Sequence, residues 1–396
     1  MKKFYVLRII GISILIAAAL NAASFAEDER NSIIIGEKAT IFSKILNEKR
    51  TLLVSTPAGY EEDAEVYPVL FLLDGETHFQ YVAALAKYLG SIKSIPPMLV
   101  VGIQNTDRTR DMTPLSQKPD EIKRFPSHGG AENFLAFITK ELAPWLKDNY
   151  RTGSYKILAG HSHGGLFVIN AMFTDPAAFN AYLAISPSLQ WNDQSLVKEA
   201  DVFFGNTKLP DFSLFLSAGN EGGALLGGIR KFSGILDEKA PENIDWHFEH
   251  MPTESHASVS LRSTQLGLLF IFSDWELSDP LKTYNESGMG AIEQFYEKRD
   301  KKYGYNTGVP AHIIIRLIAE SAAAGLIDSA TDLLFKYYEV VKPPAFFLEN
   351  LADENRKQGN RGKAIELYRL VLKASPDSQS TKKALTELER TKTEKQ

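Results

Sequence analysis

The chain has 396 residues, of which 44% are hydrophobic, so it can bury a large core and is long enough for about two domains. Its 44 basic and 49 acidic residues give a formal net charge of -5, which indicates neither a nucleic-acid partner nor an acidic membrane surface. The absence of cysteine excludes disulfides, a thiol nucleophile and thiolate metal sites.

Residues 1–26 have the pattern of a secretion signal. Basic residues come first, an apolar run follows at 9–20, and small residues at 24–26 offer a cleavage site. We therefore expect an exported bacterial protein, periplasmic or secreted. The alternative is an uncleaved segment that anchors the protein to a membrane, for which the apolar run is short.

Seven segments after the signal are expected to be strands, with helical segments between most of them. Alternation of buried strands and helices predicts an α/β fold with a mainly parallel sheet that helices cover on both faces. The expected strands are 48–57, 67–75, 97–105, 155–162, 181–188, 212–220 and 244–252. Residues 130–151 space their apolar side chains at helical intervals and should pack on this sheet.

The pattern changes near residue 280, where the chain becomes polar and interrupted. We expect the sheet domain to span 27–280, a linker to span 281–300 and a small all-α domain to span 301–396. The tail repeats small and aromatic positions with a period of 34, for example Gly325 with Gly359, which resembles tetratricopeptide helix pairs. The alternative is a generic set of helical hairpins with chance similarity.

The segment "AGHSHGGLF" (159–167) lies between an expected strand and an expected helix and contains a G-x-S-x-G motif centred on Ser162. In that context the serine occupies a sharp strand-to-helix turn and exposes its hydroxyl, as in the nucleophile elbow of α/β-hydrolases. His161 and His163 could instead form a metal-binding pair. Neither a carboxylate nor a third histidine is spaced nearby, so no metal and no cofactor is expected.

A serine nucleophile needs a histidine base, which follows the serine along the chain in this class of enzyme. His247 and His250 fall inside an expected strand, and His312 belongs to the helical tail. His256 lies just past the end of a strand, where a base can reach Ser162, and we assign it that role.

The acid of the triad should also follow a strand end. Glu221 does so directly after the 212–220 run, and its role would be to orient the imidazole and stabilise its cation. Two other carboxylates compete for this role. Glu254 is too close in sequence to His256 to face it easily, and Asp237 has the pattern of a helical surface.

A tetrahedral intermediate needs backbone donors for its oxyanion. The amide of His163, which follows the nucleophile, is the first candidate. The second should come from the turn after the 67–75 strand, where the amide of Glu76 lies next to Gly75. The alternative for that segment is an ordinary strand-terminating turn.

The polar loop 105–114 follows a strand on the same predicted edge of the sheet. Arg108 and Arg110 could bind an anionic or phenolate-bearing substrate, or equally could be solvated or pair with local carboxylates. The sequence leaves open whether Phe79, Tyr81 and Trp191 are pocket walls or core residues.

Together the segments "YPVLFLLDGETHF", "VGIQNTDRTRDMTP", "AGHSHGG" and "ESHASVS" resemble an esterase family of α/β-hydrolases. This family includes esterase D-type S-formylglutathione hydrolases, feruloyl esterases, bacterial siderophore esterases and mycolyltransferases. The resemblance covers about residues 35–275 and is strongest to the exported branch that hydrolyses siderophore triesters. It implies the same nucleophile and base, an acid at or near Glu221, and oxyanion amides at His163 and in the Gly75 to Glu76 turn.

The leading hypothesis is a metal-free serine hydrolase that acts on a small-molecule carboxylic ester through an acyl-enzyme. An acyltransferase would use the same triad with a different acceptor. From another class, the hydrolase domain could be vestigial, in a scaffold protein whose helical repeats bind a protein partner. The presence of candidates for nucleophile, base and acid argues against that alternative.

Overall fold

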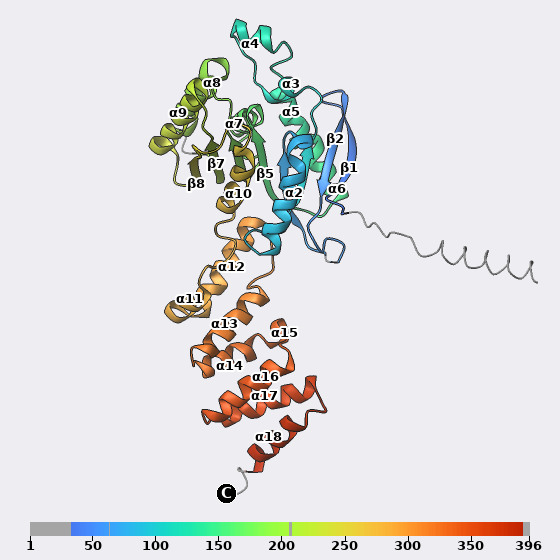
Figure 1. The fold of residues 1–396 in the computed structure, drawn as a ribbon, viewed down its shortest axis with the longest axis vertical. Coiled ribbons are helices and arrows are strands. Elements are labelled where there is room, and N and C mark those ends of the chain that lie inside the picture. Colours follow the sequence, from blue (N-terminus) through green and yellow to red (C-terminus); the bar gives the residue numbers. More distant parts are fainter. Residues whose placement is uncertain (1–32, 63, 206–207, 391–396) are drawn as a thin grey trace, which may run out of the picture.

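The computed structural model describes residues 33–62, 64–205 and 208–390, and the expected signal at 1–26 lies outside these ranges. The chain forms one sheet flanked by helices, and a second, helical region extends away from it (Figure 1). In the described part of the chain no helix is both long and apolar enough to cross a membrane.

The sheet has eight strands in the order β1-β2-β4-β3-β5-β6-β7-β8. The β1–β2 and β2–β4 pairs are antiparallel, and every pair from β4 to β8 is parallel. The strands are β1 (Glu37–Ser43), β2 (Glu48–Ser55), β3 (Tyr67–Leu72), β4 (Leu99–Ile103), β5 (Thr152–His161), β6 (Ala181–Ile185), β7 (Phe212–Ala218) and β8 (Ile244–His250).

The mainly parallel sheet and all seven expected strands are confirmed, and sequence analysis missed only the edge strand β1. The reason is visible in the burial of its side chains, since only Ser43 among its seven residues is buried. An edge strand that covers little of the core lacks the apolar run that marks β3 and β4, whose residues are all buried.

Two apolar layers hold helices against the sheet. One layer contains residues of η1, α5, α7, α8 and α9, and the other contains residues of α2 and α10. The helices of this part are α2 (Gly75–Ser91), α3 (Arg108–Met112), α4 (Pro119–Arg124), α5 (Ala131–Phe137), the π-helical turn η1 (Ile138–Leu142), α6 (Ala143–Asn149), α7 (His163–Thr174), α8 (Trp191–Phe204), α9 (Gly223–Lys239) and α10 (Val259–Ile271).

The helix expected at 130–151 is present as α5, η1 and α6 in succession. Phe134, Ile138 and Leu142 are fully buried, as their spacing predicts. The π-helical turn precedes Pro144, which has no N–H to donate, and the amide of Ala143 bonds to the carbonyl of Ile138 instead of that of the usual residue four positions back.

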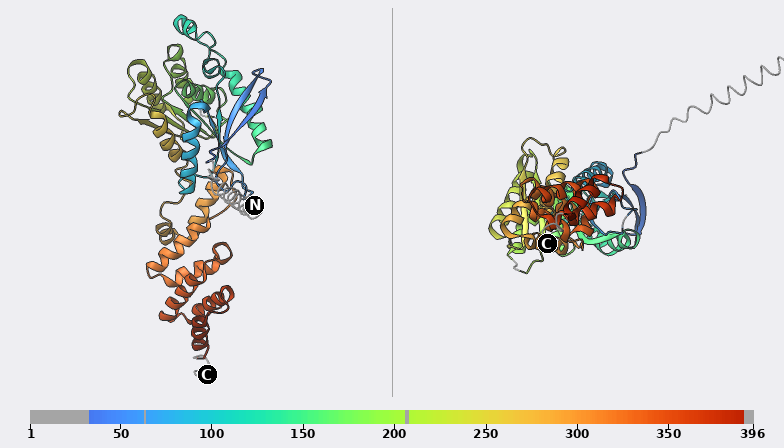
Figure 2. Two further views of the ribbon diagram at one scale, coloured as in Figure 1. Left: turned by 45° about the vertical axis from the view of Figure 1, so that its right-hand side comes forward. Right: turned by 90° about the horizontal axis from the view of Figure 1, so that it is seen from below.

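The second region consists of helices (Figure 2), and they share an apolar core of their own. Residues 281–300 are not the linker expected from the sequence, because two helices occupy them and bury Ile292 and Tyr296 in this core. The helices are α11 (Pro280–Ser287), α12 (Met289–Tyr303), α13 (Ala311–Ala323), α14 (Ile327–Lys336), α15 (Tyr338–Val341), α16 (Ala345–Lys357), α17 (Arg361–Ala374) and α18 (Gln379–Arg390).

The positions that repeat in the sequence are equivalent in the structure. Helices α13 and α16, and likewise α14 and α17, begin 34 positions apart. Gly325 and Gly359 both end the turn between paired helices with positive φ, 78° and 82°, and Ala330 and Ala364 are both fully buried. The assignment of these pairs to the tetratricopeptide class stays a prediction.

The end of α12 joins the helical region to the sheet domain. The ring of Tyr303 is 99% buried and lies 4.8 Å from that of Tyr155 and 5.1 Å from that of Phe272, measured between centroids. Its hydroxyl donates to the carboxylate of Asp274 and lies 3.0 Å from the carbonyl oxygen of Ile271. The C-terminal turn of α12 therefore completes the core beneath α10.

We predict that Tyr303→Ala lowers the free energy of unfolding of the sheet domain by about 3–5 kcal/mol, the usual cost of deleting a buried aromatic ring. Tyr303→Phe, which keeps the ring and loses the hydroxyl, should cost about 1–2 kcal/mol. Urea unfolding followed by tryptophan fluorescence measures both. Tyr88→Ala, at a tyrosine that is 60% exposed, is the control and should change the value by less than about 0.5 kcal/mol. An unchanged stability in Tyr303→Ala would contradict this account of the joint.

Candidate active site

Ser162 lies in the turn between β5 and α7, as the motif predicts. Its backbone has φ 62° and ψ −115°, a conformation that residues other than glycine rarely adopt. The amide of Ser162 donates to the carbonyl of Ile185 at the end of β6, at 2.9 Å. The neighbouring strand therefore holds the strained residue at the edge of the sheet.

Close backbone approach explains the glycines around the serine. A Cβ on Gly160 would lie 2.5 Å from the carbonyl oxygen of Gly164. A Cβ on Gly165 would lie 2.8 Å from the carbonyl oxygen of Ile185. Gly164, which completes the G-x-S-x-G pattern, has more room, since its nearest neighbour would be an Asp74 carboxylate oxygen at 3.3 Å. Gly165, outside the five-residue motif, is thus more tightly constrained than Gly164.

The structure brings Ser162, His256 and Glu221 together. His256 Nε2 lies 3.0 Å from Ser162 Oγ, and His256 Nδ1 lies 2.8 Å from Glu221 Oε1. Glu221 follows β7 and His256 follows β8, so all three residues lie at the carboxyl ends of parallel strands. Because a carboxylate can only accept, Nδ1–H donates to Glu221 and Nε2 is free to accept the hydroxyl proton of Ser162.

Glu221 is buried and remains ionised. Burial on its own would raise the pKa of this carboxyl, but hydrogen bonds from His256 and from Ser186 outweigh that effect and lower the pKa below its ordinary value. Ser186 Oγ donates to Glu221 Oε1 at 2.5 Å. Sequence analysis missed Ser186, because nothing near it marks a partner 35 positions further along the chain.

The rejected candidates lie elsewhere. Glu254 accepts a hydrogen bond from Ser258, four residues away, and Asp237 is exposed on α9. His247 lies on β8 beside Glu249, and His312 on α13 is 3.0 Å from Glu276. Their positions agree with the reasoning that set them aside.

The two expected oxyanion amides belong to helix N-termini. His163 is the first residue of α7, and Glu76 is the second residue of α2. Amides of a first helical turn have no acceptor within their own helix, so both can serve a ligand. The start of α7 also packs on the turn before α2, where Asp74 and Leu73 lie nearest to Gly164. The Glu76 side chain, in contrast, bonds to Asn105.

An ion pair lies next to this turn, in which the Asp74 carboxylate is buried and Arg108 is partly exposed. Arg108 donates to both carboxylate oxygens of Asp74, at 2.6 and 2.9 Å, and Asn105 donates to one of them at 2.7 Å. Burial would raise the pKa of Asp74, but the hydrogen bond and the charge of Arg108 lower it overall. The guanidinium also donates to the carbonyl of His161 at 3.2 Å.

The arginines therefore follow the alternative of pairing with local carboxylates. Arg110 donates to Glu48 at 2.6 Å and to Asp111 at 2.7 Å, and the hydrogen bond from Arg110 lowers the pKa of Glu48 to about 2. Arg108 is 35% exposed and lies at the edge of the elbow. Arg108 is engaged by both oxygens of Asp74, and the substrate-binding role considered for the two arginines stays a prediction.

The histidines that flank Ser162 face different surroundings. The ring of His163 lies 5.5 Å from that of Phe125 and 5.6 Å from that of Trp191, whereas the ring of His161 lies 4.6 Å from that of His256. The described residues contain no group of three metal-ligating side chains that could hold an ion. Trp191 and Phe79 are both buried core residues, and Trp191 also lies beside the elbow.

Comparisons with known proteins identify an esterase family independently of this geometry. Residues 43–221 match the family described as "Putative esterase". A ferri-bacillibactin esterase, BesA of Bacillus subtilis, is 34% identical over 44% of this chain and 66% of its own length. The siderophore enterobactin esterase of Emericella nidulans is 37% identical over 28% of this chain and 42% of its own length. The chain belongs to this esterase family.

The curated relatives of this esterase family are matched over about two thirds of their length or less. The solved structure of an IroE-like serine hydrolase from Shewanella oneidensis covers 75% of this chain and 97% of its own, with a TM-score of 0.64 and 29% identity. An uncharacterised protein from Capnocytophaga ochracea covers 89% of this chain and 99% of its own, with a TM-score of 0.70 and 16% identity. The latter likeness concerns the fold alone, and at this coverage it extends into the helical region.

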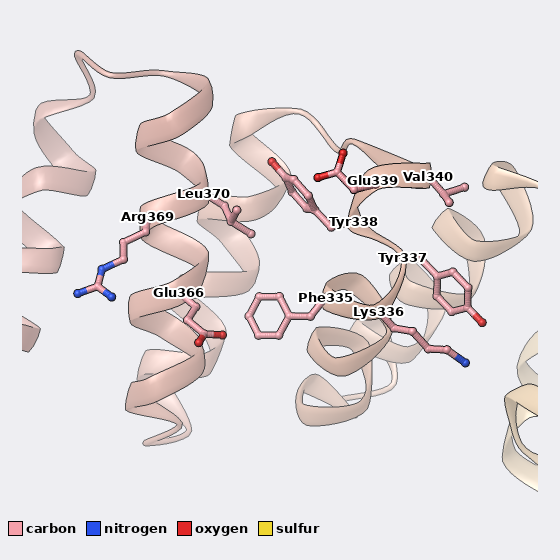
Figure 3. Close-up of a pocket in the computed structure, with 9 residues that line it drawn as sticks. All are labelled: Phe335, Lys336, Tyr337, Tyr338, Glu339, Val340, Glu366, Arg369 and Leu370. Carbon is pink, nitrogen blue, oxygen red and sulfur yellow. The ribbon is translucent and has the colours of Figure 1, made fainter.

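This member of the esterase family also has a pocket far from Ser162, in its helical region. A cavity of about 450 Å³ separates α14 and α15 from α17. Phe335 points from α14 towards Glu366 and Leu370 of α17 (Figure 3). The basic residues at its rim are paired, Lys336 with Glu293 and Arg369 with Glu389. The lining also contains two acidic residues, Glu339 and Glu366.

The buried imidazole of His163 should make the stability of the protein depend on pH. Burial first, and then the charge of Arg108, lowers the pKa of His163 to about 4. The unfolded chain, with an ordinary histidine pKa near 6.5, then binds more protons than the folded one as the pH falls from about 6.5 to 4, so stability is lost over that range. We expect His163→Phe to lose less stability between pH 7 and pH 4.5 than the wild type does, as measured by urea unfolding.

His247→Gln, which changes an exposed imidazole, is the control for that comparison and should follow the wild-type curve. If His163→Phe loses as much stability between pH 7 and pH 4.5 as the wild type does, His163 is not the cause of the pH dependence.

Proposed function

We propose that the protein is a serine carboxylic-ester hydrolase that works through an acyl-enzyme. The observation that carries the proposal is the pair of contacts from His256, 3.0 Å to Ser162 Oγ and 2.8 Å to Glu221 Oε1. The hydroxyl of Ser162 thus contacts a base, and that base contacts a buried, ionised acid. An activated serine requires both contacts.

The proposed reaction has two halves. Ser162 Oγ attacks the ester carbonyl while His256 Nε2 takes its proton, and Glu221 stabilises the resulting imidazolium. The negative charge on the carbonyl oxygen is met by the amide of His163 and by that of Glu76. Collapse of the intermediate breaks the bond to the alcohol, which leaves with the proton from His256. Water, activated by the same imidazole, then releases the acid from Ser162.

For the substrate we propose a siderophore-type ester. Support comes from two relatives, a ferri-bacillibactin esterase and a siderophore enterobactin esterase. Arg108, although paired with Asp74, is partly exposed at the edge of the elbow, and the partly buried ring of Phe125 lies beside His163. A catecholate ester combines the negative charge and the aromatic rings that such groups recognise.

Two further parts of the proposal come from the sequence. The pattern at 1–26 leads us to propose that the enzyme is exported. The tail's binding of a protein partner stays a prediction, as does membrane attachment through an uncleaved signal. Water is proposed as the acceptor, and an acyltransferase would differ only in the acceptor that it admits.

The first experiment measures the kinetics of residues 27–396 on short-chain and long-chain nitrophenyl esters, a feruloyl ester and a catecholate trilactone. We expect the trilactone to give the highest kcat/KM and Ser162→Ala to lower kcat at least about a thousandfold on each active substrate. A fluorophosphonate probe should label the wild type at Ser162. Absence of labelling would favour the vestigial scaffold, and activity confined to short simple esters would contradict the siderophore assignment.

The acid can be tested separately. Glu221→Ala should lower kcat by about 10²–10⁴-fold, because the imidazole loses the group that sets its tautomer and stabilises its cation. Glu254→Ala removes a carboxylate two residues from His256 that bonds to Ser258, and should change kcat by less than about fivefold. Equal losses in the two variants would overturn the assignment of Glu221.

A further inference from the structure

His161 makes a contact that the proposed reaction does not use. Its Nε2 lies 2.7 Å from the backbone carbonyl oxygen of His256, across 95 positions of sequence. His161 is the last residue of β5 and directly precedes the nucleophile. One hydrogen bond therefore connects the turn that carries Ser162 to the main chain of the base.

The protonation of His161 follows from its partner and its surroundings. A carbonyl oxygen can only accept, so Nε2 of His161 must carry a hydrogen. Burial, with the nearby imidazoles of His256 and His78, lowers the pKa of His161 to about 4. The ring is therefore neutral near pH 7. A neutral ring also adds no charge next to His256, whose ring centroid is 4.6 Å away and which becomes a cation when Ser162 attacks.

The other bonds that hold this loop lie on either side of His256. The amide of Asn220 donates to the carbonyl of Glu254 at 2.6 Å, and the amide of Val259 donates to that of Ser255 at 3.0 Å. The contact from His161 acts on the carbonyl of His256 itself. The side chain of His256 is 39% exposed, and Glu221 restrains only the Nδ1 edge of its ring. A hydrogen bond that fixes the main chain of His256 therefore limits how far the ring can shift.

We propose that His161, as the neutral Nε2–H form, is a positioning residue that holds the main chain of His256 so that its imidazole stays within reach of Ser162 Oγ. This inference rests on the proposed function, because it assigns a role to a neighbour of the same three residues. Through this hydrogen bond, the turn that carries Ser162 also positions the base.

The test compares two side chains of similar shape, one with and one without a donor. His161→Gln keeps an N–H near the position of Nε2, and His161→Met does not. On the best ester of the substrate panel, His161→Met should lower kcat by about 10–100-fold with KM changed less than about twofold, since small displacements of a catalytic group cost up to about 10²-fold. His161→Gln should stay within about fivefold of the wild type.

The control is His78→Gln. It changes an imidazole of the same cluster, 5.8 Å from the ring of His161 between centroids, and leaves the bond to His256 in place. We expect its kcat within about threefold of the wild type. If His161→Met does not fold, His161→Leu provides the same loss of the donor.

A second readout needs no turnover. The proton between His256 Nδ1 and Glu221 should give a low-field resonance that is retained in the wild type and in His161→Gln and is broadened or lost in His161→Met. This pattern in a protein that hydrolyses no ester would support the positioning role while the proposed function fails. A fully active His161→Met with an intact resonance, or a His161→Gln as impaired as His161→Met, would overturn the inference and leave the proposed function standing.

Discussion

The backbone of Ser162 is held in a conformation that costs free energy, and the packing of β5, α7 and β6 keeps it there. Gly160 and Gly165 permit this packing, because a side chain at either position would overlap main-chain atoms. The strain places the hydroxyl at the edge of the sheet instead of within a strand or helix. In the proposed reaction, the base, the acid and the two helix N-termini can act only because of where they lie relative to this hydroxyl.

Charge is distributed around the nucleophile in two separate networks. Glu221 is kept ionised by His256 and Ser186, and Asp74 is kept ionised by Arg108 and Asn105. The imidazoles of His161 and His163 are kept neutral mainly by burial. In the proposed reaction, the cation can therefore develop on His256 beside a fixed carboxylate, while the neighbouring imidazoles stay neutral.

The helical region is joined to the sheet domain through its core, not through an extended linker. Tyr303 fills a space beneath α10 together with Tyr155 and Phe272, and α11 and α12 begin the second apolar core. A division of the chain at residue 280 would cut through this joint. The aromatic ring at the end of α12 belongs to the stability of the sheet domain although it lies in the sequence of the tail.

The sequence by itself predicted the sheet, the elbow and the meeting of Ser162, Glu221 and His256, because each depends on local patterns and on the rule that strand ends meet at one edge. Only the tertiary structure revealed strand β1, the helices at 281–300, and the Asp74–Arg108 pair. The bonds from Ser186 to Glu221 and from His161 to His256 likewise join residues 35 and 95 positions apart. Such contacts leave no periodicity in the chain, since they depend on how strand ends and loops pack once the sheet has formed.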